Sequence, residues 1–240
     1  MTCLGAATAC SGTHHAAAPA ASTAATVART HQRATAKPSR LVALLVPHPA
    51  FSAPSSQAPR LESVDARRPL TGERTTLPVL GQTVTSGSVW LHVLLPGRPN
   101  GHTGWIAKRG TAARSTSWTI HVDLSARRVT ISRDGRPVRT VKAVVGKPST
   151  PTPRGQFFVE EVIALPASAV GAPFALALSA RSNVFQVFDG GPGEIALHGL
   201  MNVGGTLGTA SSHGCVRLDN GTMRWLVKRI RPGTPVTIGS

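Results

Sequence analysis

The chain has 240 residues, enough for one large domain or two small ones. Apolar residues make up 41% and aromatic residues only 4%, so any core must be built from Val, Leu, Ile and Ala. The formal net charge of +16 predicts attraction to a polyanion, but it is equally compatible with a plain basic surface. The basic residues are scattered, and no zinc-finger, basic-heptad or aromatic RNA-binding pattern is present. Nucleic acid is therefore not an expected partner.

Residues 1–60 are expected to form an unfolded segment and linker. Residues 16–36 are mostly Ala, Ser, Thr and Pro, and no acidic residue precedes Glu62. Such a composition offers too little apolar surface to offset the entropy cost of ordering. An apolar run at 41–46 interrupts the segment but is too short to cross a membrane, so we expect no transmembrane span.

The first twelve residues end in Ala-Thr-Ala-Cys-Ser-Gly. This sequence resembles the small-residue cleavage site of an exported bacterial lipoprotein, with Cys10 as the lipidated residue. The basic opening and the full apolar stretch of such a signal are missing. We interpret the match as an export remnant with a lipid anchor at Cys10, with chance similarity as the alternative.

Residues 61–117 are expected to form a small β module. Within them, residues 89–95 and 104–106 predict strands, and residues 96–101 predict a cluster of turns. This pattern is similar to the SH3-like modules that precede catalytic domains in bacterial wall enzymes. We therefore expect a separate module ahead of the rest of the chain.

Residues 118–240 are expected to form a mainly β body. The alternation of apolar and polar residues predicts strands at 119–124, 128–132, 136–145, 156–165, 174–178, 184–188, 195–200 and 235–239. Asp134-Gly135 predicts a tight hairpin turn, because glycine tolerates the positive φ that the turn requires. The density of strands indicates a mainly β body rather than a helical fold.

One helix is predicted near the C-terminus. Asp219 or Asn220 can cap its first turn, and Pro232-Gly233 can end it. An apolar stripe at helical spacing is formed by Met223, Leu226, Val227 and Ile230. The predicted fold class is therefore mainly β with one C-terminal helix.

The most informative residue is Cys215, the single cysteine of the body. No disulfide framework can form there, so Cys215 is either buried and inert or a working thiol. A thiol needs a base or a positive neighbour to act as a nucleophile near neutral pH. His213 lies two residues before it and His198 seventeen residues before it, across a glycine-rich stretch. We keep both histidines as catalytic candidates beside Cys215.

Several neighbours of the thiol suit acyl transfer. Backbone N–H groups around Gly214 and Cys215, and that of Gly199, could stabilise an oxyanion. Arg217 could hold a substrate carboxylate, and Ser212 could hydrogen-bond to substrate or simply shape a turn. One cysteine and two histidines could also bind zinc, but no Cys-x-x-Cys or His-x-x-x-His pair is present. We therefore expect no metal.

These residues resemble the signature of a known family. His198-Gly199 followed by Ser-His-Gly-Cys-Val-Arg at 212–217 is similar to the motif of L,D-transpeptidase (YkuD-type) catalytic domains. Residues 145–157 are similar to an upstream family segment, and 188–191 are compatible with the turn expected before His198. The resemblance covers about residues 118–239, and two motifs in the expected order make it specific.

The resemblance implies a β-sandwich-like domain that acts on peptidoglycan. Cys215 would attack the L,D peptide bond of a stem tetrapeptide, release D-alanine and pass the acyl group from a thioester to an acceptor amine. His213 matches the family's base position, and His198 matches the upstream histidine that lines the same pocket. The location would be extracytoplasmic, on the cell-wall or periplasmic side. Stem peptides would be donor and acceptor, an anionic wall polymer could be a further partner, and no organic cofactor would be needed.

Two alternatives stay open. The first is an L,D-carboxypeptidase, in which water replaces the acceptor amine at the same thioester. The second is a non-catalytic wall-binding protein that uses the basic N-terminal half. The set of Cys215, His213 and His198 argues against the second alternative, because binding alone needs no nucleophile beside a base.

Overall fold

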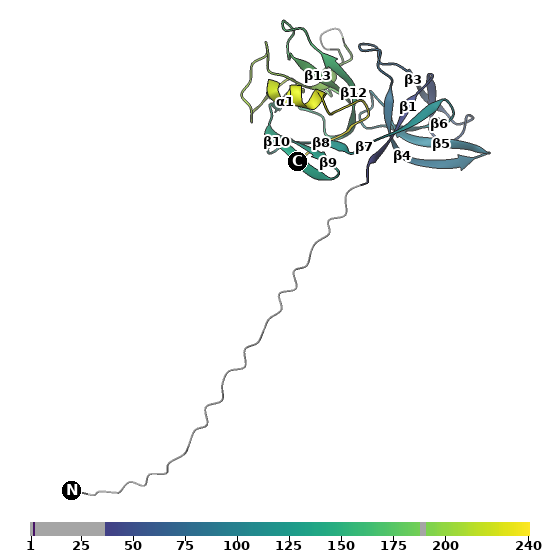
Figure 1. The fold of residues 1–240 in the computed structure, drawn as a ribbon, viewed down its shortest axis with the longest axis horizontal. Coiled ribbons are helices and arrows are strands. Elements are labelled where there is room, and N and C mark those ends of the chain that lie inside the picture. The colour runs from purple at the N-terminus through teal and green to yellow at the C-terminus, as the bar shows by residue number, and fades with distance from the viewer. Residues whose placement is uncertain (1, 3–36, 188–190) are drawn as a thin grey trace. The chain divides into compact units, whose positions relative to one another are not determined.

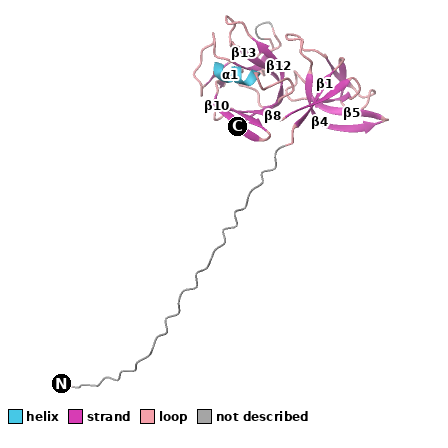
Figure 2. Ribbon diagram, viewed as in Figure 1, coloured by secondary structure: helices cyan, strands magenta, loops and turns pink. Residues whose placement is uncertain are grey.

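The computed structural model describes residue 2 and residues 37–187 and 191–240. Residues 35–240 form one compact unit. Its described part is mainly β with a single α-helix, as Figure 2 shows and as the sequence predicts. The expected disorder of residues 3–36, the anchor at Cys10 and the turn at 188–190 lie outside the described residues.

The N-terminal part is a seven-stranded sheet with the order β3-β2-β6-β5-β4-β1-β7. Its predicted strands at 89–95 and 104–106 are confirmed as β5 and β6. Leu44, Leu77 and Ile106 are fully buried in its core. The strands are β1 Ser39–Leu44, β2 His48–Phe51, β3 Arg60–Val64, β4 Thr76–Thr85, β5 Ser88–Leu94, β6 Thr103–Ala107 and β7 Thr111–Thr116.

The prediction of an unfolded segment through residue 60 is wrong for β1 and β2. β1 lies between β4 and β7 and pairs with both in antiparallel register. Its residues 41–44 are all buried, with exposed fractions of 5% or less. Four consecutive buried apolar residues supply the burial that the surrounding Ala-rich and Pro-rich composition lacks. The sheet therefore begins at Ser39 and not after residue 60.

The C-terminal part is an eight-stranded sheet with the order β10-β9-β8-β17-β12-β13-β14-β16. A short parallel pair, β11 and β15, lies beside it. The predicted strands are confirmed, except for the one at 184–188. The strands are β8 Trp118–Asp123, β9 Arg128–Arg133, β10 Arg136–Lys142, β11 Val145–Gly146, β12 Gly155–Ala164, β13 Phe174–Arg181, β14 Glu194–His198, β15 Ala210–Ser212, β16 Val216–Arg217 and β17 Pro235–Gly239.

The predicted hairpin turn and helix cap are both confirmed. Asp134 and Gly135 have φ angles of 52° and 73°, as the two-residue turn between the antiparallel strands β9 and β10 requires. Helix α1 spans Asn220–Val227, and the Asp219 carboxylate accepts the N–H of Thr222 at 2.8 Å. No helix among the described residues is long and apolar enough to cross a bilayer.

Helix α1 packs its apolar stripe against the second sheet. Met223, Leu226 and Ile230 are fully buried in the same cluster as the inward residues of β8, β9, β12 and β13. Ile230 follows the end of the helix and continues its buried face. Figure 1 shows α1 close to β12 and β13. The helix thereby supplies part of the core of the eight-stranded sheet.

The strand predicted at 184–188 is not observed, and the described residues 184–187 form bends instead. The Ser182 hydroxyl accepts the N–H groups of Val184 at 3.2 Å and Phe185 at 3.0 Å, which turns the backbone away from an extended path. Val184 and Val187 are exposed by 48% and 70%. The apolar residues that suggested a strand therefore bury no face.

Strand β12 belongs to both cores. Successive side chains of a strand point to opposite faces. Phe157 accordingly lies in the core of the eight-stranded sheet, and Phe158 lies in the core of the seven-stranded sheet. Both rings are 1% exposed. One strand thus ties the two sheets together by apolar burial.

Candidate active site

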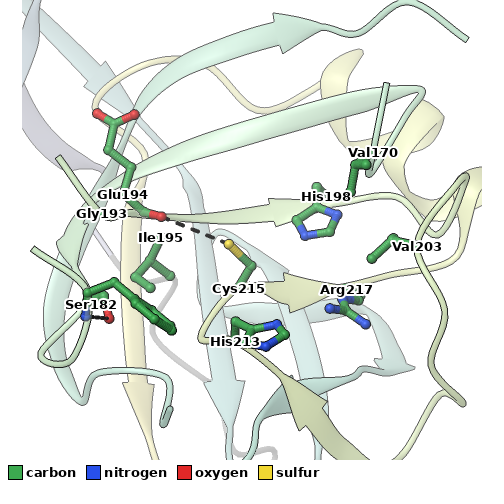
Figure 3. Close-up of a pocket in the computed structure, with 11 residues that line it drawn as sticks. Val170, Ser182, Gly193, Glu194, Ile195, His198, Val203, His213, Cys215 and Arg217 are labelled. Atoms are coloured by element: carbon green, nitrogen blue, oxygen red, sulfur yellow. Dashed lines mark hydrogen bonds between the residues drawn. The ribbon is translucent and has the colours of Figure 1, made fainter. Parts of the chain in front are cut away.

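The candidate site lies where β14 and β16 run side by side. The two strands are parallel, with Leu197 opposite Val216 and His198 opposite Arg217. Cys215 immediately precedes β16 and faces a cavity of about 240 Å³, shown in Figure 3. Of the predicted site residues, Cys215, His198, His213 and Arg217 line this cavity. The full lining is Val170, Ser182, Phe185, Gly193, Glu194, Ile195, His198, Val203, His213, Cys215 and Arg217.

The Cys215 thiol is held against the backbone of β14. Its Sγ lies 4.0 Å from the carbonyl oxygen of Glu194, drawn as a dashed line in Figure 3. Burial raises the pKa of Cys215, although the backbone N–H of Ala196 and the charge of Arg217 favour the thiolate. The resting group is therefore a neutral thiol near pH 7, and it needs a base to become a nucleophile.

His198 is fixed as a neutral imidazole. Its Nδ1 lies 2.8 Å from the carbonyl oxygen of Gly199. A carbonyl can only accept, so Nδ1 carries the proton and Nε2 of the neutral ring is an acceptor. Burial lowers the pKa of His198, and the charge of Arg217 acts in the same direction. Gly171 backs the ring closely, because an added Cβ there would lie 2.5 Å from Nδ1.

His213 has a different environment from His198. It is exposed, and it lies on the segment between β15 and β16. The centroid of its ring is 6.2 Å from that of Phe185, with the planes tilted by 55°. Figure 3 shows both imidazoles on the cavity side of Cys215. The structure thus brings the two candidates to one cavity, where His198 is partly buried and His213 is exposed.

Ser212 shapes the turn that carries the thiol. Its hydroxyl donates to the carbonyl oxygen of Cys215 at 2.6 Å and accepts the N–H of Gly214 at 3.1 Å. Ser212 is fully buried and does not line the cavity. The expectation that Ser212 binds substrate is therefore not supported, because both of its hydrogen bonds go to backbone.

We expect Ser212→Ala to lower the free energy of unfolding by about 1–3 kcal/mol and to slow any reaction of Cys215. The variant leaves a buried N–H and a buried carbonyl without their partner. Urea unfolding measures the first effect, and the rate of thiol alkylation measures the second. Ser211→Ala is the matched control, because Ser211 is exposed and bonds only to Thr209. Equal stability of the two variants would contradict this role of Ser212.

The segment 147–154 supports the same turn from outside. Thr150 donates its hydroxyl to the carbonyl oxygen of Ser212 at 3.1 Å, and Thr152 donates to that of Gly214 at 2.8 Å. The Thr152 hydroxyl also accepts the N–H of Gly146 at 2.9 Å. The sequence marked this segment as a family motif and a Pro-stiffened loop. Its role as a support was missed, although two threonines alternating with prolines were the available signal.

Of the N–H groups predicted for oxyanion stabilisation, those of Gly214 and Gly199 already have partners within the protein, and that of Cys215 has none in the part that the structure describes. The N–H of Gly214 donates to the Ser212 hydroxyl, and the N–H of Gly199 donates to the carbonyl oxygen of Gly171 at 2.8 Å. Both assignments are therefore corrected. The N–H of Cys215 makes no hydrogen bond to any described residue. It is the backbone donor nearest to the thiol that a reacting carbonyl could reach.

Arg217 brings a fixed positive charge to the cavity. Its Nη1 donates to the carbonyl oxygen of Gly204 at 2.5 Å, which ties the guanidinium to the glycine-rich stretch. Its Nε is buried and has no hydrogen-bond partner in the described part of the chain. Burial lowers the pKa of Arg217, yet arginine stays protonated at any ordinary pH. The side chain is thus suited to hold a carboxylate beside Cys215.

Several cavity residues carried no signal in the sequence. Val170, Ile195 and Val203 supply apolar walls, and Ser182 with Phe185 supplies one side. Apart from Ile195 on β14, they come from loops that are far apart in the chain, so no local pattern marks them. Among residues 37–187 and 191–240, no three His, Cys, Asp or Glu side chains gather in a way that could bind a metal ion.

Comparison with known proteins shows the family of the C-terminal half of the chain. Residues 117–238 match the family described as YkuD, the L,D-transpeptidase catalytic domain. L,D-transpeptidase 1 of Mycobacterium tuberculosis is 29% identical over 127 residues, which are 48% of this chain and 47% of that protein. The chain therefore matches about half the length of this relative.

Solved structures give weaker likenesses. An L,D-transpeptidase from Mycobacterium smegmatis is 19% identical, with a TM-score of 0.41 over 68% of this chain and 99% of its own. The transpeptidase LdtMt1, solved in complex with imipenem, is 20% identical, with a TM-score of 0.42 over 67% and 100%. The family match itself covers half of the sequence and includes every candidate site residue. The chain belongs to the YkuD family of L,D-transpeptidase catalytic domains.

Proposed function

We propose that the protein is a cysteine-dependent L,D-transpeptidase that acts on peptidoglycan stem tetrapeptides. The observation that carries the proposal is the cavity itself. It combines a buried thiol, a neutral imidazole with a defined acceptor nitrogen, and a guanidinium beside them. A binding protein needs no such set, because recognition alone requires neither a nucleophile nor a base.

In the first half-reaction, Cys215 attacks the carbonyl between the diamino acid and the terminal D-alanine of the donor stem. His198 Nε2 takes the thiol proton as the C–S bond forms, and the N–H of Cys215 stabilises the oxyanion. The C–N bond then breaks, and D-alanine leaves with the proton from His198. Arg217 is suited to bind the D-alanine carboxylate before it leaves.

In the second half-reaction, the side-chain amine of an acceptor stem attacks the thioester. His198 takes a proton from the amine, and the thiol is restored as the new amide forms. Water at the same position would give hydrolysis and an L,D-carboxypeptidase. The fixed, neutral His198 favours this residue as the base over His213, the base position that the family resemblance suggested.

The organisation of the chain is part of the proposal. Residues 118–240 would form the catalytic domain, which begins at β8, and the sheet before it would form a separate module. Membership of a family of wall enzymes implies an extracytoplasmic location. An anionic wall polymer is a suitable further partner for a chain with a net charge of +16.

The test is intact-mass spectrometry of the chain with a tetrapeptide-bearing muropeptide. We expect wild-type protein to form a covalent adduct, release D-alanine and yield crosslinked dimers. Cys215→Ala should do none of these, because only the thiol can carry the acyl group. D-alanine release without dimers would replace the transferase with a carboxypeptidase. Binding of muropeptide by both proteins, with no adduct and no D-alanine, would refute both enzymatic readings.

A further inference from the structure

One wall of the cavity is made by residues between β13 and β14. Ser182 and Phe185 lie at one end of this segment, and Gly193 lies at the other. Ser182 accepts two nearby N–H groups, and its own N–H donates to the carbonyl oxygen of Gly193 at 2.7 Å. The described residues 182–187 form no strand, so their positions are not set by strand pairing.

Arg98, on the loop between β5 and β6 of the N-terminal sheet, reaches this wall from outside. Its Nη2 donates to the carbonyl oxygens of Ser182 at 2.7 Å and Phe185 at 3.0 Å. Its Nη1 donates to the carbonyl oxygen of Pro192 at 2.8 Å. One guanidinium thus joins both ends of the wall with three hydrogen bonds from a charged donor, which are among the stronger kind.

Asn100, two residues further on the same loop, holds the start of the wall. Its Oδ1 accepts the N–H of Arg181 at 2.7 Å, and its Nδ2 donates to the carbonyl oxygen of Arg181 at 2.8 Å. Nδ2 also donates to Oδ1 of Asn183 at 3.1 Å. The side-chain amide therefore pairs with the backbone at the last residue of β13, where strand pairing ends.

Glycine at 193 is required for this packing. Gly193 has a φ of +70°, and an added Cβ would lie 2.1 Å from the carbonyl oxygen of Phe185 and 3.3 Å from Nη2 of Arg98. Any larger residue would separate the two ends of the wall and push away the guanidinium. The close packing of Gly193 against the Phe185 carbonyl and the Arg98 guanidinium therefore depends on both Gly193 and Arg98.

We infer that Arg98 and Asn100 are positioning residues of the active site. They hold the cavity-lining residues Ser182, Phe185 and Gly193 in the positions that receive the donor stem peptide, so that the N-terminal sheet sets substrate affinity. This inference rests on the proposed transpeptidase function. The thiol and His198 are supported separately, through Ser212, Thr152 and Gly199. Loss of the loop contacts should therefore weaken donor binding more than it slows the chemical step.

The test compares full-length Arg98→Met and Arg98→Lys with wild type. Two measurements are made: hydrogen exchange of the amides at 181–187, and KM and kcat for a tetrapeptide donor. We expect Arg98→Met to exchange at least about tenfold faster in this segment and to raise KM about tenfold, with kcat changed less than about threefold. Arg98→Lys keeps the charge but loses the forked donor geometry of the guanidinium. Its exchange rates and its KM should therefore lie between those of wild type and Arg98→Met.

Arg40→Met is the matched control. Arg40 lies on the same sheet, but its guanidinium donates to Gln82 at 2.7 Å and touches no part of the wall. It should leave both exchange and KM unchanged. Melting temperatures of all three variants separate a general loss of stability from a local effect on the wall.

The remaining outcomes overturn the inference. Unchanged exchange at 181–187 in Arg98→Met would show that the loop does not hold the wall. Faster exchange with unchanged KM would show that the wall does not bind the donor. If wild type itself turned over no donor, the proposed function would fail, while the exchange data would still decide whether Arg98 holds the wall.

Discussion

His198→Gln is expected to reduce the rate of acyl-enzyme formation by about 10²–10⁴-fold at pH 7, the usual contribution of a positioned general base. Its imidazole is buried beside Cys215, with Nδ1 bound to the Gly199 carbonyl and Nε2 as the acceptor. Glutamine keeps much of the volume but offers no base. The measurement is the single-turnover rate of adduct formation, followed by intact-mass spectrometry.

The pH dependence of this rate gives a sharper test. Burial lowers the pKa of His198 and raises that of Cys215. The reactive pair is a neutral imidazole and a neutral thiol, so the acid limb of the wild-type profile should lie below the ordinary histidine value of about 6.5. In His198→Gln only the thiolate can attack, and its rate should rise about tenfold per pH unit up to the raised pKa of Cys215.

His213→Gln is the control for this assignment. The His213 ring is exposed and tilted against Phe185 at the cavity, so we expect less than about a tenfold loss and an unchanged acid limb. If the acid limb of the pH profile were lost in His213→Gln and kept in His198→Gln, the general base would be His213, the histidine of the Ser-His-Gly-Cys motif.

The sequence predicted the strands with regular alternation and the cap of α1, because these depend on local patterns. Asp219 caps the helix, and Asp134-Gly135 makes the hairpin, as expected from their own chemistry. The strand predicted at 184–188 failed because a single hydroxyl at Ser182 turns the chain. β1 was missed because its partners, β4 and β7, lie far along the chain.

In the candidate site, too, some features could be predicted from local sequence and others could not. Cys215, His198, His213 and Arg217 could be named from two short motifs, and they line one cavity. The motifs did not indicate which partners the polar groups of these residues bond to. The N–H groups of Gly199 and Gly214 point to partners inside the protein, and Ser212 faces backbone rather than substrate. Hydrogen-bond direction depends on tertiary packing, which no spacing of residues encodes.

Glu160→Gln is expected to lower the free energy of unfolding by about 3 kcal/mol, because it removes the buried carboxylate that lies between two largely buried guanidinium groups. The Glu160 side chain is fully buried on β12. It pairs with Arg68 of the N-terminal part on one side and with Arg181 at 3.3 Å on the other. Arg181 in turn pairs with Glu194 at 3.2 Å, and the Glu194 carbonyl contacts the Cys215 thiol.

Asp134→Asn is the control for this ion network. Arg133 and Asp134 form an exposed pair at 3.6 Å, with 59% and 44% of their side chains accessible, so its loss should cost less than about 1 kcal/mol. Asparagine also tolerates the positive φ of 52° at this position. Urea unfolding of the full chain measures both variants. Equal midpoints would mean that the buried carboxylate stabilises the junction of the two sheets no more than a surface pair does. A large difference, together with slower adduct formation in Glu160→Gln alone, would indicate that the same chain of charges that joins the two sheets also supports the strand beside the thiol.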